Sequence, residues 1–272
     1  MAQLKPLAAA VAELVHDGDT VAIEGFSHLV PFAAGHELIR QQRRDLTIVR
    51  MVPDVISDQL IGAGCVARLV FSWAGNPGVG SLHRFRDAIE RGWPRKLDIE
   101  EHTHAGLAAR FVAGASGLPF MVLRAYAGTS LIDVTEHVRL IGDPFTGQQV
   151  AAIAAINPDV AVIHAQQADR AGNVQLWGIA GVQKEAVLAA GRSLVTVDEI
   201  VDELKPVPGG VILPSWVVSM VAHVPGGTYP SYAHGLTTRD DGFYAAWDSI
   251  ARGRDTFVAW MEEQNLPVAA HA

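Results

Sequence analysis

A glutamate stands directly before a glycine where the first predicted strand, residues 20–23, ends; the local sequence is Glu24-Gly25-Phe26-Ser27. A carboxylate displayed at a strand end could act as a general base or a nucleophile, or it could accept a local hydrogen bond. A glycine lets backbone approach a bound group closely. This segment is therefore a candidate ligand loop, with a purely structural turn as the alternative.

Two further glutamates, Glu100 and Glu101, form a second group of possible acid–base residues. They stand at the start of a predicted helix, residues 101–113, where the helix dipole favours negative charge, so that helix capping is the first interpretation. In the alternative, Glu101 points into a cleft between subunits. His102 and His104 follow, but side chains two residues apart on a helix diverge, which does not favour a shared metal ion. We expect no metal site.

Sequence motifs for common cofactors and nucleophiles are missing from this chain. It contains no GxGxxG, GxxxxGK[ST], GxSxG or HExxH. Cys65 is the only cysteine, which excludes an internal disulfide and a cysteine-built zinc site. Its apolar surroundings are typical of a small core residue. His164 ends a buried predicted strand and is interpreted as a core or interface histidine.

The composition limits the class of protein. The chain has 272 residues, 49% of them hydrophobic, which is enough for a large core. A formal net charge of -8 without a clustered basic face argues against a nucleic-acid partner. No apolar run approaches the roughly 20 residues of a membrane span, and the N-terminus has no signal-peptide cleavage pattern. We therefore expect no membrane partner and a cytoplasmic location.

The elements that must position these residues alternate between strand and helix. Apolar residues three and four apart in 4–16 indicate a helix, and the β-branched run 46–52 indicates a strand covered on both faces. Further strands are predicted at 20–23, 66–71, 120–125, 159–165, 174–177, 193–197 and 216–222, and further helices at 32–41, 55–63, 82–91, 101–113, 181–190 and 244–262. This alternation predicts one domain, residues 1–272, with an open, mainly parallel, doubly wound α/β sheet and helices on both faces. An antiparallel excursion is expected near 166–177.

In such a sheet, ligands bind at the carboxyl ends of the strands. Most of the loops predicted there are rich in glycine or small polar residues, so they can offer backbone N–H groups to an anion or a carbonyl oxygen. The loops are 24–28, 72–81, 125–130, 164–168 and 223–230.

Taken in order, the segments around these loops resemble a known family. They read GDTVAIEGFSHLVPFAA, DQLIGAGCVARLVFSWAGN, HRFRDAIERG with LDIEEHTHAGL, GLPF, DVAVIHAQQADRAGNVQLWG, TVDEIV and HVPGGTYPSYAHG. In these segments the chain resembles the alpha subunit of family I coenzyme A transferases, most of all the alpha-subunit group of the glutaconate CoA-transferases. The resemblance spans nearly the whole chain.

The resemblance implies the open α/β fold of that superfamily and a two-subunit acyl-CoA:carboxylate CoA-transferase. It implies a homologous beta subunit that supplies the nucleophilic glutamate, an α2β2 or larger complex, CoA thioester as substrate, and no tightly bound cofactor. The alpha subunit then helps to wall the acyl pocket. The expected lining residues are Gly25, Phe26, Ser27, Ser72, Asn76 and Gln166.

Two departures keep other functions open. The family's strand-end motif is usually Gly-Gly-Phe, whereas this chain has Glu24 at the first of these three positions. Related pairs resemble hydrolases that open the rings of cyclic diketone CoA thioesters with an acidic residue of the alpha subunit; that position aligns near Glu101 or His104. A hydrolase with Glu24 or Glu101 as its catalytic residue is therefore the alternative. A non-catalytic acyl-CoA or sugar-phosphate sensing module is the third interpretation.

Overall fold

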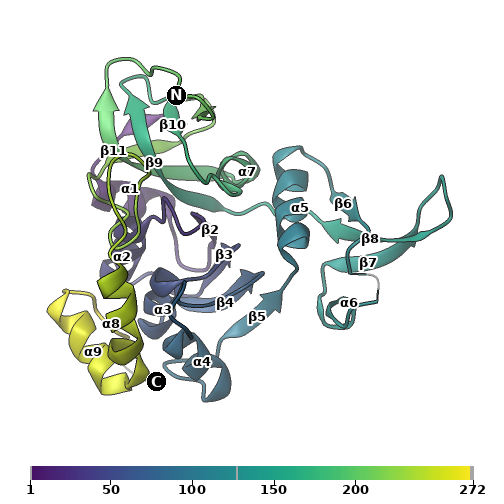
Figure 1. Ribbon diagram of the computed structural model, residues 1–272, viewed down its shortest axis with the longest axis horizontal. Coiled ribbons are helices and arrows are strands. Elements are labelled where there is room, and N and C mark those ends of the chain that lie inside the picture. The colour runs from purple at the N-terminus through teal and green to yellow at the C-terminus, as the bar shows by residue number, and fades with distance from the viewer. Residues whose placement is uncertain (1, 127, 270–272) are drawn as a thin grey trace.

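The computed structural model describes residues 2–126 and 128–269, which are organised by two sheets (Figure 1). Eight strands of the larger sheet follow the order β1-β13-β11-β9-β2-β3-β4-β5, and each neighbouring pair is parallel. β10 and β12 add an antiparallel extension beside β9. The strands are β1 (Gln3–Leu4), β2 (Thr20–Glu24), β3 (Leu46–Arg50), β4 (Val66–Phe71), β5 (Asp98–Glu101), β9 (Val160–Asp169), β10 (Val174–Leu176), β11 (Arg192–Val201), β12 (Val211–Leu213) and β13 (Met220–His223).

Helices cover both faces of this sheet, as expected from the sequence. Side chains from six helices share one hydrophobic core with it, and side chains from two others share a second core on the opposite face. The first group is α1 (Leu7–Leu14), α2 (Phe32–Arg40), α3 (Val55–Gly62), α4 (His83–Glu90), α8 (Asp241–Arg252) and α9 (Arg254–Glu263); the second is α5 (His104–Ala115) and α7 (Gln183–Ala189). Strand β3 shows why neighbouring residues within it are apolar: Ile48 enters the first core and Val49 the second.

A smaller antiparallel sheet projects from the main body on the right of Figure 1. Its strands pair in the order β6-β8-β7, and a small core of Tyr126, Val138, Ala151 and Ile153 lies against it. We call residues 120–126 and 128–154 the arm. It comprises β6 (Phe120–Leu123), α6 (Leu131–Val134), β7 (Val138–Gly142) and β8 (Gln149–Ala154).

The structure corrects three of the predicted elements. Glu100 and Glu101 lie in the edge strand β5, and α5 begins only at His104. The expected strand from 216 starts at Met220, because a turn bonds Val217 N–H to the Pro214 carbonyl. The closing helix is divided at Gly253 into α8 and α9. The arm strands β7 and β8 were not predicted, since their only clear sequence signal was the turn between them.

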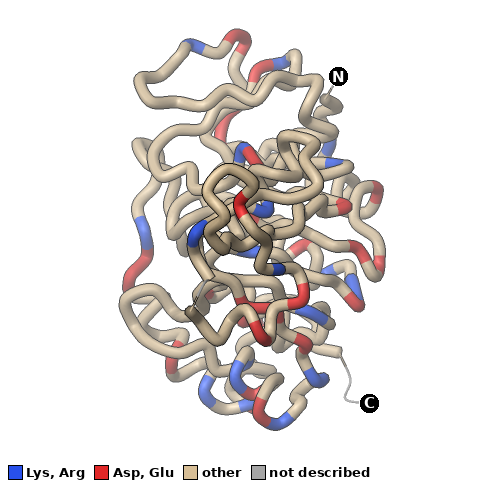
Figure 2. Tube along the Cα trace, turned by 90° about the vertical axis from the view of Figure 1, so that its right-hand side faces the viewer, with Lys and Arg blue, Asp and Glu red and all other residues tan. Residues whose placement is uncertain are grey.

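Charges of both signs are interspersed along the trace in Figure 2. Among the described residues, no helix is long and apolar enough to cross a membrane.

Candidate active site

The parallel strands bring the predicted ligand loops to one edge of the sheet. Register pairs Arg50 with Phe71 and Phe71 with Glu101, so β3, β4 and β5 end side by side. Glu24 ends β2 next to Ile163 of β9. The carboxyl ends of the strands therefore form a continuous edge, which is where α/β sheets bind ligands.

The loop after β2 is tightly constrained at this edge. A Cβ on Gly25 would lie 2.5 Å from the Leu29 carbonyl oxygen, so only glycine fits there without a shift of the backbone. Ser27 and Leu29 hold positive φ angles of 58° and 53°, which are uncommon for residues other than glycine. The Phe26 ring is half-buried and meets His104 edge to face, with 6.2 Å between ring centroids. The loop thus has one defined path.

Glu24 is buried behind this loop, with only 2% of its surface exposed. Its carboxylate accepts a hydrogen bond of 2.8 Å from Met51 N–H, which is the local acceptor role considered for it. Burial raises the pKa of Glu24 to about 7, and the nearby Arg50 guanidinium opposes that rise. Asp54, another buried carboxylate, pairs with Arg50 at 3.2 Å, and burial likewise raises its pKa.

Two of the predicted pocket residues lie in the loop after β4. Ser72 donates a 2.7 Å hydrogen bond from Oγ to the Met51 carbonyl, which ties β4 to β3. Asn76 is buried; its Nδ2 donates to the Tyr244 carbonyl at 2.7 Å, while its Oδ1 has no hydrogen-bond partner among the described residues. The side chain of Asn76 therefore fixes the loop against α8.

An open hollow of about 460 Å³ lies beside the loop of Gly25–Ser27. It is lined by Tyr232 and by residues 234–239, and we call it the edge hollow. Ser231 Oγ donates to the Ser27 carbonyl at 3.1 Å, and Leu29 N–H donates to the Tyr232 carbonyl at 2.9 Å. The wall of the hollow and the loop are thus held together.

Gln166 and His28 support the same wall from inside. Gln166 is fully buried, and its amide accepts from Trp177 N–H at 3.1 Å and donates to the Trp177 carbonyl at 2.9 Å. His28 Nε2 accepts from His234 N–H at 2.9 Å, and burial lowers the pKa of His28, which keeps its ring neutral. Gln166 is therefore a buried support for the lining of the hollow.

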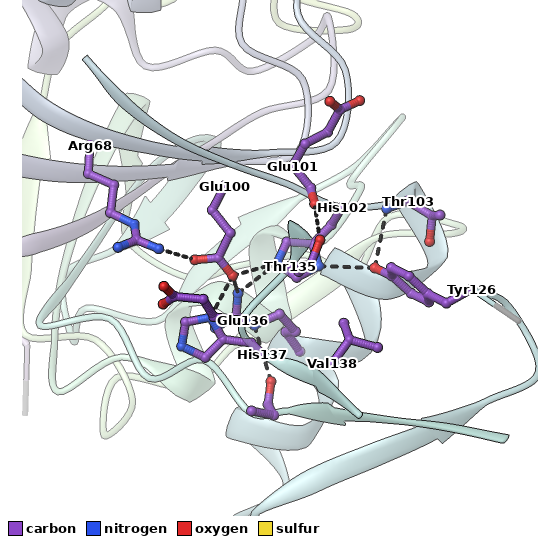
Figure 3. A network of polar contacts seen from close by, with 12 residues as sticks. Arg68, Glu100, Glu101, His102, Thr103, Tyr126, Thr135, Glu136, His137 and Val138 are labelled. Carbon is purple, nitrogen blue, oxygen red and sulfur yellow. Dashed lines mark hydrogen bonds and ion pairs between the residues drawn. The ribbon is translucent and has the colours of Figure 1, made fainter. Parts of the chain in front are cut away.

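A cluster of charged side chains around Glu100 lies farther along the edge (Figure 3). One carboxylate oxygen of Glu100 contacts Arg110 at 2.6 Å, His137 Nδ1 at 2.6 Å and His102 Nε2 at 2.8 Å; the other contacts Arg68 at 2.8 Å. Burial alone would raise the pKa of Glu100, but these partners outweigh it and hold that pKa well below its usual range. Glu100 is therefore ionised.

The Glu100 cluster corrects the capping interpretation. Thr103 caps α5, since its Oγ1 accepts from Gly106 N–H at 2.9 Å. Glu101 is exposed; its carbonyl accepts a hydrogen bond from Thr135 Oγ1 at 3.1 Å, and its carboxylate points away from the cluster in Figure 3. The sequence did not indicate a role for Arg50, which lies near Glu24, or for the Glu100 partners Arg68, Arg110 and His137. Each of these four residues lies outside the element of the glutamate with which it interacts. The local sequence signal for strand β5 was weak: apolar and polar residues alternate from Leu97 to Glu100.

This geometry defines an α/β protein whose candidate site lies at the carboxyl edge of a parallel sheet, beside a glycine-dependent loop and an open hollow. The coenzyme A transferase family model matches residues 5–223. The chain belongs to the coenzyme A transferase family.

Named relatives agree with this membership. The chain is 62% identical to a 3-oxoadipate CoA-transferase subunit of Pseudomonas knackmussii over 97% of this chain and 93% of the relative. It superposes on glutaconate coenzyme A-transferase from Acidaminococcus fermentans with a TM-score of 0.90 and 30% identity, covering 99% of this chain and 90% of that one. A cysteine-to-serine variant of the decarboxylase AibA/AibB gives a TM-score of 0.85 and 30% identity, covering 96% and 98%.

Proposed function

We propose that this chain is the alpha subunit of a two-subunit acyl-CoA:carboxylate CoA-transferase, acting as one domain beside a homologous beta subunit. The observation that carries the proposal is its 62% identity to a subunit of a 3-oxoadipate CoA-transferase along nearly its whole length. We further propose 3-oxoadipate, or a closely related dicarboxylic acid, as the carboxylate. Coenzyme A enters as the thioester of the donor and leaves as the thioester of the acceptor, so it acts as a substrate and not as a bound cofactor.

The chemistry needs a carboxylate nucleophile, which we assign to the beta subunit. Its glutamate attacks the thioester carbonyl, CoA thiolate leaves, and an acyl-glutamyl anhydride forms. The thiolate then attacks the glutamyl carbonyl and releases the first carboxylate, which leaves a glutamyl-CoA thioester. The acceptor carboxylate then attacks the glutamyl-CoA thioester, which releases CoA thiolate and forms a second anhydride. The thiolate attacks the acceptor's carbonyl in that anhydride, which releases the new acyl-CoA and the free glutamate. The free energy of the thioester is thus kept in an anhydride or a thioester at every step and is not lost to hydrolysis.

The alpha subunit then supplies one wall of the acyl pocket. Gly25, Phe26 and Ser27 are the proposed lining, with Ser72, Asn76 and Gln166 holding the neighbouring backbone. Support comes from the single path of the loop, from its place at the carboxyl edge, and from the edge hollow beside it. The hollow is open on this chain, which fits a pocket that a second subunit completes.

The test is acyl exchange by the pair. The chain is co-expressed with a beta-like subunit from the same genome, and 3-oxoadipyl-CoA formed from succinyl-CoA and 3-oxoadipate is measured by mass spectrometry. We expect turnover by the pair. We also expect borohydride to inactivate the pair only after exposure to succinyl-CoA, because the glutamyl-CoA thioester is then present. A pair that turns over without any borohydride-sensitive state contradicts the transferase mechanism.

A CoA-thioester ring-opening hydrolase is the second candidate, because Glu101 is exposed at the carboxyl edge, where a substrate could meet it. Another pair of similar fold is a decarboxylase, so this fold also carries other chemistry. A hydrolase would lose turnover in Glu101→Gln or Glu24→Gln, whereas the transferase retains most of its activity in Glu101→Gln. Abolished turnover in Glu101→Gln, together with resistance to borohydride, would replace the proposed function by hydrolysis.

A further inference from the structure

Arg50 is a fully buried cation that pairs with Asp54 and also donates three hydrogen bonds to backbone carbonyls at the ends of β2 and β3. Its Nη1 donates to the Ile23 carbonyl at 3.0 Å, its Nη2 to the Gly25 carbonyl at 3.1 Å, and its Nε to the Val52 carbonyl at 2.9 Å. A planar guanidinium with five donors in fixed directions can hold several acceptors at defined positions, which a lysine ammonium cannot do. Arg50 therefore fixes the backbone on both sides of Glu24.

Glu24 completes this arrangement from the opposite strand. Its carboxylate accepts from Met51 N–H, the residue directly after Arg50. Each of the two strand ends thus contributes a buried side chain that binds the backbone of the other. Leaving any of these buried groups without a partner carries the full desolvation penalty of that group, so the arrangement resists displacement.

The backbone conformation of residues 25–29 is also constrained within the loop itself. A Cβ at Gly25 would meet the Leu29 carbonyl, and Ser27 and Leu29 have positive φ angles. Such conformations persist only where the surroundings hold them. Arg50 stabilises this conformation through its hydrogen bond to the Gly25 carbonyl.

We propose that Arg50 and Glu24 are positioning residues that set the place of the Gly25–Ser27 wall and, through it, the acyl groups that the pocket accepts. This inference rests on the proposed function, since it concerns the same pocket. It gives a reason for a glutamate at the position where the family pattern has glycine. A glycine there would leave Met51 N–H without this acceptor.

The charge of the Glu24 carboxyl depends on pH, and charged side chains from several elements lie near it. Glu24 is faced by Arg50 of β3 and by Asp54 at the start of α3, and Asp54 in turn interacts with Arg239 and Tyr244. The pKa of Glu24 is about 7. The carboxylate therefore changes its charge near neutral pH, and the wall should respond in that range.

The experiment is a competition between two acceptors in the assembled pair. Succinyl-CoA is the donor, and 3-oxoadipate and acetoacetate are present together, so that the product ratio reports relative kcat/KM. This ratio does not depend on the amount of active enzyme. The variants are Arg50→Lys and the near-isosteric Glu24→Gln. The matched control is Arg84→Lys, because Arg84 is also a buried arginine paired with an aspartate, Asp87, and lies away from the loop.

We expect Arg50→Lys to change the product ratio about 10-fold, since a displacement of about 1 Å at a reacting group has effects of this size or larger. Glu24→Gln should keep the ratio found at low pH and abolish its change between pH 6 and 8. Arg84→Lys should leave the ratio as in the unmodified pair while lowering its thermal stability. Hydrogen exchange of residues 25–29 should rise in Arg50→Lys and not in Arg84→Lys.

An unchanged product ratio and unchanged exchange of residues 25–29 in Arg50→Lys would overturn the inference. A pH-dependent ratio retained in Glu24→Gln would do so as well, even where Arg50→Lys fails to fold. Absence of any transfer by the unmodified pair is a different result, because it refutes the proposed function. The exchange measurement still decides whether Arg50 holds the loop in that case.

Discussion

At the scale of single residues, Glu24 shows how burial changes the meaning of a carboxylate. The sequence places it at a strand end, where it could be displayed to substrate. The structure buries it and pairs it with Met51 N–H. Its position could be predicted from the strand pattern, but its burial could not, because that depends on Arg50 and Asp54, which belong to other segments.

Replacement of Glu24 by glutamine should remove a pH dependence of stability. The pKa of Glu24 in the folded chain is about 7, above the usual 4.5, so the folded state holds its proton more tightly. The resulting stabilisation is fully present below about pH 4.5 and is lost as pH rises through 7, a change on the order of 3 kcal/mol. Urea unfolding between pH 5 and 8 should show this fall in the unmodified chain. An equal fall in Glu24→Gln would assign it to another group.

Gly25 is the residue for which the structure gives the sharpest steric argument. A Cβ there would lie 2.5 Å from a backbone oxygen, so Gly25→Ala should destabilise the chain by about 1–3 kcal/mol. The atom that this Cβ would meet belongs to the backbone of the candidate ligand loop, so both folding and turnover should suffer. Thermal unfolding of Gly25→Ala measures the effect, with Gly78→Ala as control, since Gly78 has open space around it and carries only the strain of a positive φ. Equal losses in the two variants would show that the contact with Leu29 is unimportant.

At the scale of elements, the Glu100 cluster joins the main sheet to α5 and the arm. Arg68 lies on β4, Glu100 on β5, Arg110 on α5 and His137 immediately before β7. Arg110 also donates to the Ala154 carbonyl of β8 at 3.1 Å. The side chain of one edge-strand residue thus links the main sheet to α5 and to the arm.

Glu100→Gln should therefore destabilise the chain strongly. Removal of one charge from a buried cluster leaves its partners uncompensated, at a cost of about 3–5 kcal/mol. Because the pKa of Glu100 is depressed in the folded chain, its contribution is present above about pH 4.5 and is lost as pH falls. Urea unfolding at pH 7 compares this variant with Glu101→Gln, whose carboxylate is exposed. A loss below about 1 kcal/mol in Glu100→Gln would show that the cluster does not secure the arm.

The elements themselves were predictable to different degrees, for physical reasons. The central strands β2, β3, β4, β9 and β11 are apolar because both faces are covered, and the sequence identified them. β5 is an edge strand with polar residues, so its pattern matched a helix start instead. β7 and β8 face only a small core, which gave them no distinct pattern. The loop at Gly25 was found from its residues, whereas the Glu100 cluster combines residues 68 to 137 and needed the fold.

At the scale of the whole molecule, the chain depends on a second subunit for its reaction. We expect the purified chain alone to show no CoA transfer with succinyl-CoA and 3-oxoadipate, and the co-expressed pair to show it, because we place the nucleophile on the beta subunit. Mass spectrometry of the products decides between these outcomes. Robust exchange by the chain alone would move the nucleophile into this sequence.

The arm has its own small core, separate from the two cores of the main sheet. So few buried side chains stabilise it little, and the Glu100 cluster contributes to its attachment. It should therefore unfold as a separate cooperative unit, at a lower free energy than the rest of the chain. In the native chain, amide protons of β6–β8 should exchange with solvent sooner than those of β9, and in Glu100→Gln they should exchange sooner still. Simultaneous exchange of both regions would show that arm and sheet open together.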